Sequence, residues 1–397
     1  MTSIPFKHSE TLTILRRRWL LTAVIYGSVL LLVYLFLQAR WPYATRWALI
    51  ATIVLVYSLW SFWRWLPENH REGESILLPT LGLGNILTLA RGLLMPLVAG
   101  FIFSPWPVGA LAWMPMSLYW LTRIADHFDG FLARRANHTT VLGAKLDMEF
   151  DSVGMWVVIL LAIWYGQVPW WYIILALARY LFIFGIWWRE RLGLPVYDLH
   201  PSVHRRIFAG CFMAFMSATL WPIVPVDALR LAGMVFFIPI ALGFLRDWLV
   251  VIGRFDPNSA SYQKVQRGFY LVFAKWGPLA LRALLFVTMV MIYRALPLST
   301  TSQAGILQPP TWVELFSTWH LPSPALLVTF VAVSGMLGTI LTTLGFVGRL
   351  ASLLLMFPIG FDIILNGLQS HNTIALITMC SIMLLSTGWY SLWDPDL

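Results

Sequence analysis

Residues 19–38 read WLLTAVIYGSVLLLVYLFLQ, a run without a charged side chain that follows directly on Arg16, Arg17 and Arg18. A helix needs about 20 mostly apolar residues to cross the hydrocarbon core of a bilayer. Clustered arginines mark the cytoplasmic end of such a helix. This stretch therefore predicts a membrane-spanning helix that enters the bilayer from the cytoplasm.

The rest of the chain has the same character. Its 397 residues are 59% hydrophobic, 15% aromatic and only 11% charged, and the mean hydropathy is +0.74. Soluble domains are nearer 25% charged, so a soluble globule, a disordered chain, a collagen-like fibre and a disulfide framework are all excluded. Apolar runs separated by Pro, Gly and charges predict about twelve spans. We therefore expect an all-α polytopic integral membrane helical bundle. The expected spans are 19–38, 46–66, 86–104, 108–126, 152–166, 169–188, 207–224, 230–250, 274–294, 323–344, 350–366 and 373–389.

The distribution of Lys and Arg predicts the orientation. With the first span entering from the cytoplasm, most basic residues outside the spans fall on the cytoplasmic side, and only Arg40, Arg46, Arg230 and Arg294 fall on the other. The positive-inside rule then places both termini in the cytoplasm, and we expect a plasma-membrane protein. The first apolar run has no small-residue cleavage site, so no cleavable signal peptide is expected.

Neither the net charge nor the cysteines indicate another class of protein. The formal charge is +9, but the basic residues are scattered between apolar runs and form no aromatic-interleaved patch, so no nucleic-acid partner is expected. Cys211 and Cys380 both lie in apolar runs, which argues against a structural disulfide.

Shifts in composition divide the chain into three predicted parts. Residues 1–75 form a two-span N-terminal extension with a charged linker, and residues 76–270 form a core of about six spans that holds nearly all of the inward-facing acidic residues. Residues 271–397 form a four-span C-terminal extension.

An acidic motif lies between the fourth and fifth predicted spans. The chain reads Asp126-His-Phe-Asp129-Gly130-Phe-Leu-Ala133-Arg134, then eight residues, then Gly143-Ala-Lys-Leu-Asp147-Met-Glu-Phe-Asp151. Spacings of three and four place each pair of aspartates on one face of a helix, and a short hairpin would bring the two faces together. Four close carboxylates repel one another, and a divalent cation with hard oxygen ligands relieves that repulsion. The alternative is that these aspartates are solvated loop residues.

These residues resemble the motif of the CDP-alcohol phosphotransferase (CDP-alcohol phosphatidyltransferase) family, D-x-x-D-G-x-x-A-R, eight residues, G-x-x-x-D-x-x-x-D, at every defined position. The segment Asn85-Ile-Leu-Thr88-Leu-Ala-Arg91 is similar to the N-x-x-T-x-x-R segment of the same family. The resemblance covers about residues 76–250 and implies a six-span catalytic core. It implies transfer of a phosphoalkyl group from a CDP-alcohol, usually CDP-diacylglycerol, to an acceptor alcohol with release of CMP.

The resemblance also implies roles for individual residues. Asp126, Asp129, Asp147 and Asp151 would bind two divalent ions, Mg²⁺ or Mn²⁺, and Asp151 would in addition remove the proton of the acceptor hydroxyl. The donor headgroup would contact residues around these aspartates, namely Asn85, Thr88, Gly130, Arg134, Thr140 and Gly143. The implied partners are a CDP-diacylglycerol-like donor, a small polar or phosphorylated alcohol and membrane lipids, and a homodimer is left open.

Basic residues beyond the motif are candidates for the acceptor site. Arg179 lies within a predicted span, where an arginine is costly unless it faces a cavity, a ligand or a partner such as Glu149. Arg205 and Arg206 either clamp a phosphate on the acceptor or touch anionic lipid.

Three further polar residues near the motif are expected to serve no metal. The offsets of His127 and His138 place them off the carboxylate face, and Glu149 is expected to point away from the site.

The C-terminal extension has a weaker signal. Gly345-Phe-Val-Gly-Arg349-Leu-Ala and the ending Gly388-Trp-Tyr-Ser391-Leu resemble the four-span DoxX-like family, over roughly residues 271–397. Asp362 and Asn366, at helical spacing, either line a polar pocket or form an interhelical hydrogen bond, and the second is favoured.

Taken together, the sequence predicts a membrane-embedded transferase of phospholipid biosynthesis with its site on the cytoplasmic face. A polytopic transporter would instead place polar residues near the bilayer midplane and show repeated halves. An intramembrane prenyltransferase would carry two Asp-rich motifs far apart in sequence, and a non-catalytic membrane scaffold would need no acidic motif.

Overall fold

The computed structural model describes residues 4–74, 76–135, 139–198, 203–256, 259–295, 310–319 and 323–393. These residues form helices joined by loops, and no strand occurs among them. They cluster into two compact units, the first comprising residues 1–176 and 216–222 and the second residues 177–215 and 223–397. The all-α fold class expected from the sequence is confirmed.

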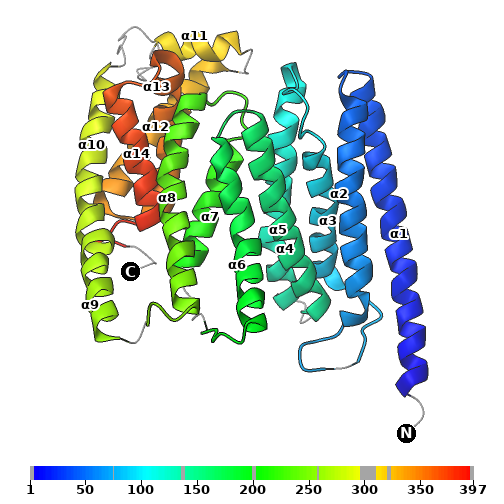
Figure 1. Cartoon of the computed structure of the whole chain (residues 1–397). Coiled ribbons are helices and arrows are strands. Elements are labelled where there is room, and N and C mark those ends of the chain that lie inside the picture. Colours follow the sequence, from blue (N-terminus) through cyan, green and yellow to red (C-terminus); the bar gives the residue numbers. More distant parts are fainter. Residues whose placement is uncertain are drawn as a thin grey trace. The chain divides into compact units, whose positions relative to one another are not determined.

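The first unit contains five long helices and the short turns between them (Figure 1). They are α1(Ile4–Gln38), α2(Ala44–Trp65), η1(Leu66–Glu68), α3(Gly82–Ala99), η2(Gly109–Trp113), α4(Met114–Arg135), α5(Val141–Trp164) and η3(Trp170–Tyr172). Helix α3 packs against α2, α4 and α5, and α1 packs against α2. The N-terminal pair of helices is thus part of the same compact unit as the helices that carry the acidic motif.

Polar anchors and a shared apolar core hold these helices together. Tyr26 on α1 donates its hydroxyl proton to the carbonyl of Leu89 on α3, and the indole of Trp47 on α2 donates to the carbonyl of Leu97, 3.1 Å away. Near the linker between α2 and α3, side chains of α1, α2, α3, α5 and the linker itself form one buried cluster. Its members are Leu15, Phe62, Leu66, Leu81, Leu89, Leu142, Leu146 and Phe150. Burial of such side chains stabilises the unit by roughly 1.5–3 kcal/mol each.

Most of the remaining helices belong to the second unit. They are α6(Ile173–Arg191), α7(Val203–Ala218), α8(Val226–Val251), α9(Ala260–Phe269), the π-helical turn η4(Tyr270–Trp276), α10(Gly277–Ala295), α11(Pro310–Thr318), α12(Pro324–Leu344), α13(Gly348–Asn366) and α14(Ser370–Leu385). The first residues of α6 and the last of α7 fall in the first unit. Helix α14 packs against α8, α10 and α13, and α12 packs against α13. The division of the chain at residues 75 and 270 stays a prediction.

Backbone carbonyls near the C-terminal motif converge on the side chain of Arg282. This buried arginine on α10 donates to the carbonyls of Thr343 at 2.9 Å, Thr387 at 3.2 Å and Trp389 at 3.0 Å. The stretch that begins at Gly345 pairs with Trp393, and Val347 N donates to the Trp393 carbonyl at 2.9 Å. The short glycine-rich motif therefore has a structural role here, and its DoxX-like resemblance stays a prediction.

Asp362 on α13 is fully buried and hydrogen-bonded. Its Oδ1 accepts from Asn366 at 2.9 Å, and its Oδ2 accepts from Asn372 on α14 at 2.7 Å. This geometry supports the interhelical hydrogen bond favoured from the sequence. Cys211 and Cys380 are both free thiols.

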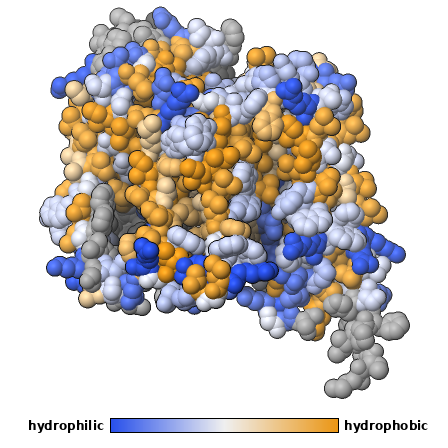
Figure 2. All heavy atoms as spheres, viewed as in Figure 1, coloured by the Kyte–Doolittle hydropathy of each residue, from blue (hydrophilic) through white to orange (hydrophobic). Residues whose placement is uncertain are grey.

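Within the described part of the chain, eight helices are long and apolar enough to cross a membrane. Helix α1 shows how they face lipid, because Leu20, Leu21 and Leu32 each expose 60–66% of their surface. Apolar residues lie along the helices and polar residues gather near their ends (Figure 2). Four of the twelve expected spans, which correspond to α4, α5, α7 and α14, are absent from the eight, so the number of spans is not confirmed. The chain is an integral membrane protein.

Candidate functional site

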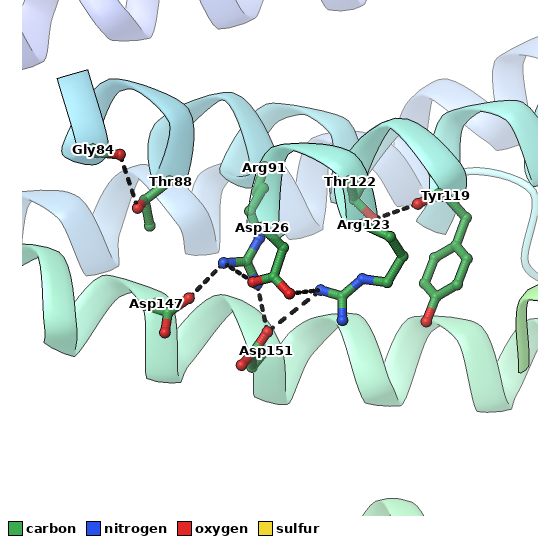
Figure 3. Close-up of polar contacts among 9 residues, drawn as sticks. All are labelled: Gly84, Thr88, Arg91, Tyr119, Thr122, Arg123, Asp126, Asp147 and Asp151. Atoms are coloured by element: carbon green, nitrogen blue, oxygen red, sulfur yellow. Dashed lines mark hydrogen bonds and ion pairs between the residues drawn. The ribbon is translucent and has the colours of Figure 1, made fainter. Parts of the chain in front are cut away.

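Three helices of the first unit, α3, α4 and α5, bring the acidic residues together. Helix α5 begins at Val141 because Thr140 caps it, its Oγ1 accepting a hydrogen bond from Gly143 N at 3.0 Å. Asp147 and Asp151 follow one turn apart on that helix and face Asp126 of α4 (Figure 3). Their side chains are 45%, 36% and 30% exposed, so the carboxylates remain open to a ligand.

Arg91 of α3 lies at the centre of the three carboxylates (Figure 3). Its Nη1 is 2.5 Å from Oδ1 of Asp126 and 2.5 Å from Oδ1 of Asp147, and its Nη2 pairs with Oδ1 of Asp151. The arginine side chain is fully buried. A buried guanidinium is strongly unfavourable without such partners, so Arg91 and the aspartates hold one another in place.

A second arginine borders the same cluster. Arg123, one turn before Asp126 on α4, places its Nη2 3.4 Å from Oδ2 of Asp126 and 3.5 Å from Oδ1 of Asp151. Among the described side chains of the cluster, three carboxylates therefore face two guanidinium groups. With all five groups ionised, these side chains carry a net negative charge, which attracts cations.

The oxygen atoms of the cluster fit a divalent cation. One carboxylate oxygen from each of Asp126, Asp147 and Asp151 lies within 4.8 Å of the others. Mg²⁺ binds oxygens at about 2.0–2.1 Å, so oxygens on opposite sides of the ion are about 4.2 Å apart. The spacing of the three oxygens is of this order, and carboxylates are the ligands that Mg²⁺ and Mn²⁺ prefer.

A second polar cluster adjoins the start of α5. Nδ2 of Asn85 donates to Oγ1 of Thr140 at 2.8 Å, and Oγ1 of Thr140 lies 3.2 Å from Oδ1 of Asn85. Gly143 permits this approach, because a Cβ at that position would lie 2.3 Å from Oδ1 of Asn85. Three of the residues expected near the donor headgroup are therefore brought together. Thr88, a fourth, is buried and donates to the Gly84 carbonyl at 3.2 Å.

Several other residues predicted from the sequence fall outside the described part of the structure. The side chains of Asp129, Gly130, Arg134, Arg205 and Arg206 lie outside the described part of the structure, as do the side chain of His127 and the whole of His138.

Glu149 and Arg179 are described. Glu149 accepts a hydrogen bond from the hydroxyl of Tyr57 on α2 at 2.6 Å. Its carboxylate thus has a partner outside the cluster of Asp126, Asp147 and Asp151. Arg179 lies half-buried on α6, and its role at an acceptor site stays a prediction.

The two arginines of the cluster were not predicted as site residues, although Arg91 ends the N-x-x-T-x-x-R segment. Arg91 lies inside a predicted span, as Arg179 does. An arginine in the bilayer is costly unless it faces a cavity, a ligand or a partner, so the argument made for Arg179 would also have identified Arg91 as a candidate. Arg123 could have been found from its spacing of three residues to Asp126.

Comparison with known proteins identifies the region that carries the site. Residues 81–245 match the family model described as CDP-alcohol phosphatidyltransferase. A CDP-diacylglycerol–glycerol-3-phosphate 3-phosphatidyltransferase of Salmonella choleraesuis is 40% identical over 72 residues, which are 17% of this chain and 37% of that protein. A protein of the same name from Cereibacter sphaeroides is 33% identical over 115 residues, 28% of this chain and 49% of that protein.

The matched stretches thus span about half the length, or less, of these curated relatives. No solved structure matches the chain significantly. The family resemblance expected from the acidic motif is confirmed over residues 81–245.

Proposed function

We propose that this chain, whose residues 81–245 match the CDP-alcohol phosphatidyltransferase family model, is an enzyme. It transfers a phosphatidyl group from a CDP-diacylglycerol-like donor to an acceptor alcohol. The products are CMP and a phospholipid. The observation that supports this most strongly is the convergence of Asp126, Asp147 and Asp151 on one point between three helices. A transporter would need no such cluster.

Asp151 accepts the proton of the acceptor hydroxyl in this proposal. The freed oxygen attacks the phosphorus that bears the diacylglycerol, and the bond from that phosphorus to the phosphate oxygen of CMP breaks. Asp126, Asp129, Asp147 and Asp151 would hold two ions, Mg²⁺ or Mn²⁺. Such ions, when bound, neutralise the pyrophosphate and the leaving CMP. Arg91 keeps three of the carboxylates facing one another.

The donor and acceptor are proposed to meet around this cluster. Asn85, Thr88, Gly130, Arg134, Thr140 and Gly143 surround the CDP headgroup. Glycerol 3-phosphate, which the names of the relatives contain, is the first acceptor to test. A phosphate on the acceptor would suit Arg179, Arg205 and Arg206, because guanidinium groups bind phosphate with paired donors.

The charges support a proposed orientation in the membrane. Lys145 and Arg71 lie near the end of the helices that carries the site, and the positive-inside rule places such an end in the cytoplasm. We propose a plasma-membrane enzyme that takes its donor from the bilayer and its acceptor from the cytoplasm.

The proposal is tested with two substitutions on one helix. Asp147→Asn should abolish CMP release and weaken Mn²⁺ binding, because an amide lacks the charge that offsets the ion. Asp151→Asn should bind CDP-diacylglycerol while turnover falls by at least about 100-fold, the usual contribution of a general base. Mn²⁺ binding is followed by electron paramagnetic resonance of the purified protein.

Glu149→Gln is the matched control. It removes a charge from the same helix between the two aspartates, and the amide oxygen can still accept from Tyr57. This variant should keep wild-type turnover. Full activity in folded Asp147→Asn would refute the metal-site assignment.

A further inference from the structure

The linker between α2 and α3 is fastened to the start of α5. The backbone carbonyl of His70 accepts from Val141 N at 3.0 Å. Glu68 pairs with Lys145 at 2.9 Å, and the ammonium group of Lys145 lies 4.2 Å from the centre of the Trp65 ring. The N-terminal extension therefore reaches Val141, the first residue of α5 and the neighbour of its cap, Thr140.

Asn69 is the buried centre of this linker. Its Nδ2 donates to the carbonyls of Leu78 at 2.7 Å and Thr80 at 3.0 Å, and its backbone carbonyl accepts from Leu78 N at 2.7 Å. The side chain is fully buried. Because both amide protons are used within the linker, the orientation of the amide is fixed and Oδ1 faces away from these carbonyls.

Oδ1 of Asn69 faces Asn85. Nδ2 of Asn85 donates to it at 3.4 Å and to Oγ1 of Thr140 at 2.8 Å. Asn85 is itself almost fully buried. The Thr140 hydroxyl can also donate to Oδ1 of Asn85, 3.2 Å away, so it suits either end of that amide. The oxygen of Asn69 can only accept, so this residue of the N-terminal extension determines which end of the Asn85 amide carries the donors.

We infer that Asn69 is a positioning residue for the donor headgroup site, acting through Asn85. This inference rests on the proposed function, in which Asn85 and Thr140 contact the CDP headgroup. Without the oxygen of Asn69, a buried N–H of Asn85 loses an acceptor, and an unsatisfied buried donor is unfavourable enough to drive the amide to rotate. The aspartates would be unaffected, because Arg91 holds them independently.

The N-terminal extension thus takes part in donor recognition. Its loss would weaken donor binding even though every residue of the acidic motif lies after residue 125. The linker appears in the sequence only as a charged connection, so this role arises from the fold.

The test compares Asn69→Ala with His70→Ala in full-length purified protein. His70 is the next residue of the same linker, its ring pairs with Glu68 at 3.1 Å, and its backbone bond to Val141 survives the substitution. Asn69→Ala should raise the KM for CDP-diacylglycerol about tenfold and leave the KM for the acceptor and the binding of Mn²⁺ unchanged, whereas His70→Ala should leave all three unchanged. Equal donor KM values in wild type and folded Asn69→Ala would overturn the inference.

A double-mutant cycle with Asn85→Ala separates positioning from general destabilisation. If Asn69 acts through Asn85, then Asn69→Ala adds no further rise in donor KM once Asn85 is alanine. Independent, multiplying effects would refute the inference. Should Asn69→Ala not fold, Asn69→Ser replaces it, since a hydroxyl can still donate to one linker carbonyl but falls short of Asn85.

Equilibrium binding of CDP-diacylglycerol in nanodiscs gives the same comparison without turnover. A wild-type protein that binds the donor but releases no CMP would refute the proposed function. An unchanged Kd for the donor in Asn69→Ala would refute the positioning role alone.

Discussion

Gly143→Ala tests whether the close contact between α5 and Asn85 is needed for donor recognition. The added methyl carbon would lie 2.3 Å from Oδ1 of Asn85 and 3.3 Å from Oγ1 of Thr140. Carbon and oxygen atoms normally approach no closer than about 3.3 Å, so the amide must move by about 1 Å. Separation of α3 from α5 is unfavourable, because it would expose the buried ring of Phe150 on α5, which packs against Gly92 of α3.

A misplacement of about 1 Å at a substrate-positioning group reduces the rate by about 100-fold, or about 2.7 kcal/mol. We therefore expect kcat/KM for CDP-diacylglycerol to fall by about this factor. The assay follows CMP release against donor concentration, and thermal unfolding checks the fold. Alanine is the better helix former by about 1 kcal/mol, so a poorly formed helix would not explain the loss.

Gly27→Ala on α1 is the control, because a Cβ there meets nothing within 4 Å. It should retain wild-type kcat/KM. A value for Gly143→Ala within threefold of wild type would refute the reasoning, since it would mean that Asn85 can move without consequence.

Three other predictions concern stability and orientation. Arg282→Ala leaves the carbonyls of Thr343, Thr387 and Trp389 without their charged donor and should lower the free energy of unfolding by at least about 3 kcal/mol. Lys264→Ala, at an exposed position, should change it little. Equal unfolding temperatures of the two variants would contradict a stabilising role for the Arg282 hydrogen bonds. The Arg71 carbonyl and Glu68 raise the pKa of His70 in the folded protein. The protonated imidazole therefore stabilises the fold fully below the pKa of His in the unfolded chain, about 6.5, and this stabilisation is lost as the pH rises through the pKa in the folded protein. His70→Ala should accordingly lower the thermal unfolding temperature at about pH 5.5 and not at about pH 8.5, and a larger effect at the higher pH would contradict this sign. An impermeant thiol reagent outside intact cells should label Ser317→Cys on α11 and not Glu74→Cys in the linker, and the opposite pattern would overturn the orientation.

Much of the acidic site could be predicted from the sequence because it depends on local spacing. Helical periodicity places Asp147 and Asp151 on one face, and the short connection after Arg135 brings that face to Asp126. Eight of the twelve spans expected from hydropathy correspond to described helices that are long and apolar enough to cross a membrane, but hydropathy missed where α5 begins. Its first eleven residues, Val141 to Asp151, carry the charges of the motif, so the apolar run begins only after Asp151 although the helix starts at Val141.

Contacts between residues far apart in the chain could not be predicted in this way. Arg91 sits among the aspartates because α3 packs between α4 and α5, which the spacing of one segment does not reveal. Asn69 reaches Asn85 only because the linker folds back on the start of α5. Likewise, the glycine-rich C-terminal motif gains its meaning from Arg282, more than sixty residues earlier.

The central claim is that the aspartate cluster transfers a phosphatidyl group to an alcohol. The most direct test measures CMP and newly formed phospholipid together, with purified protein, CDP-diacylglycerol, Mg²⁺ or Mn²⁺ and a panel of alcohols that starts with glycerol 3-phosphate. We predict equal amounts of CMP and phospholipid, dependent on the acceptor, abolished by a chelator and absent in Asp147→Asn. CMP release without a phospholipid product, or release that persists in Asp147→Asn, would contradict the claim.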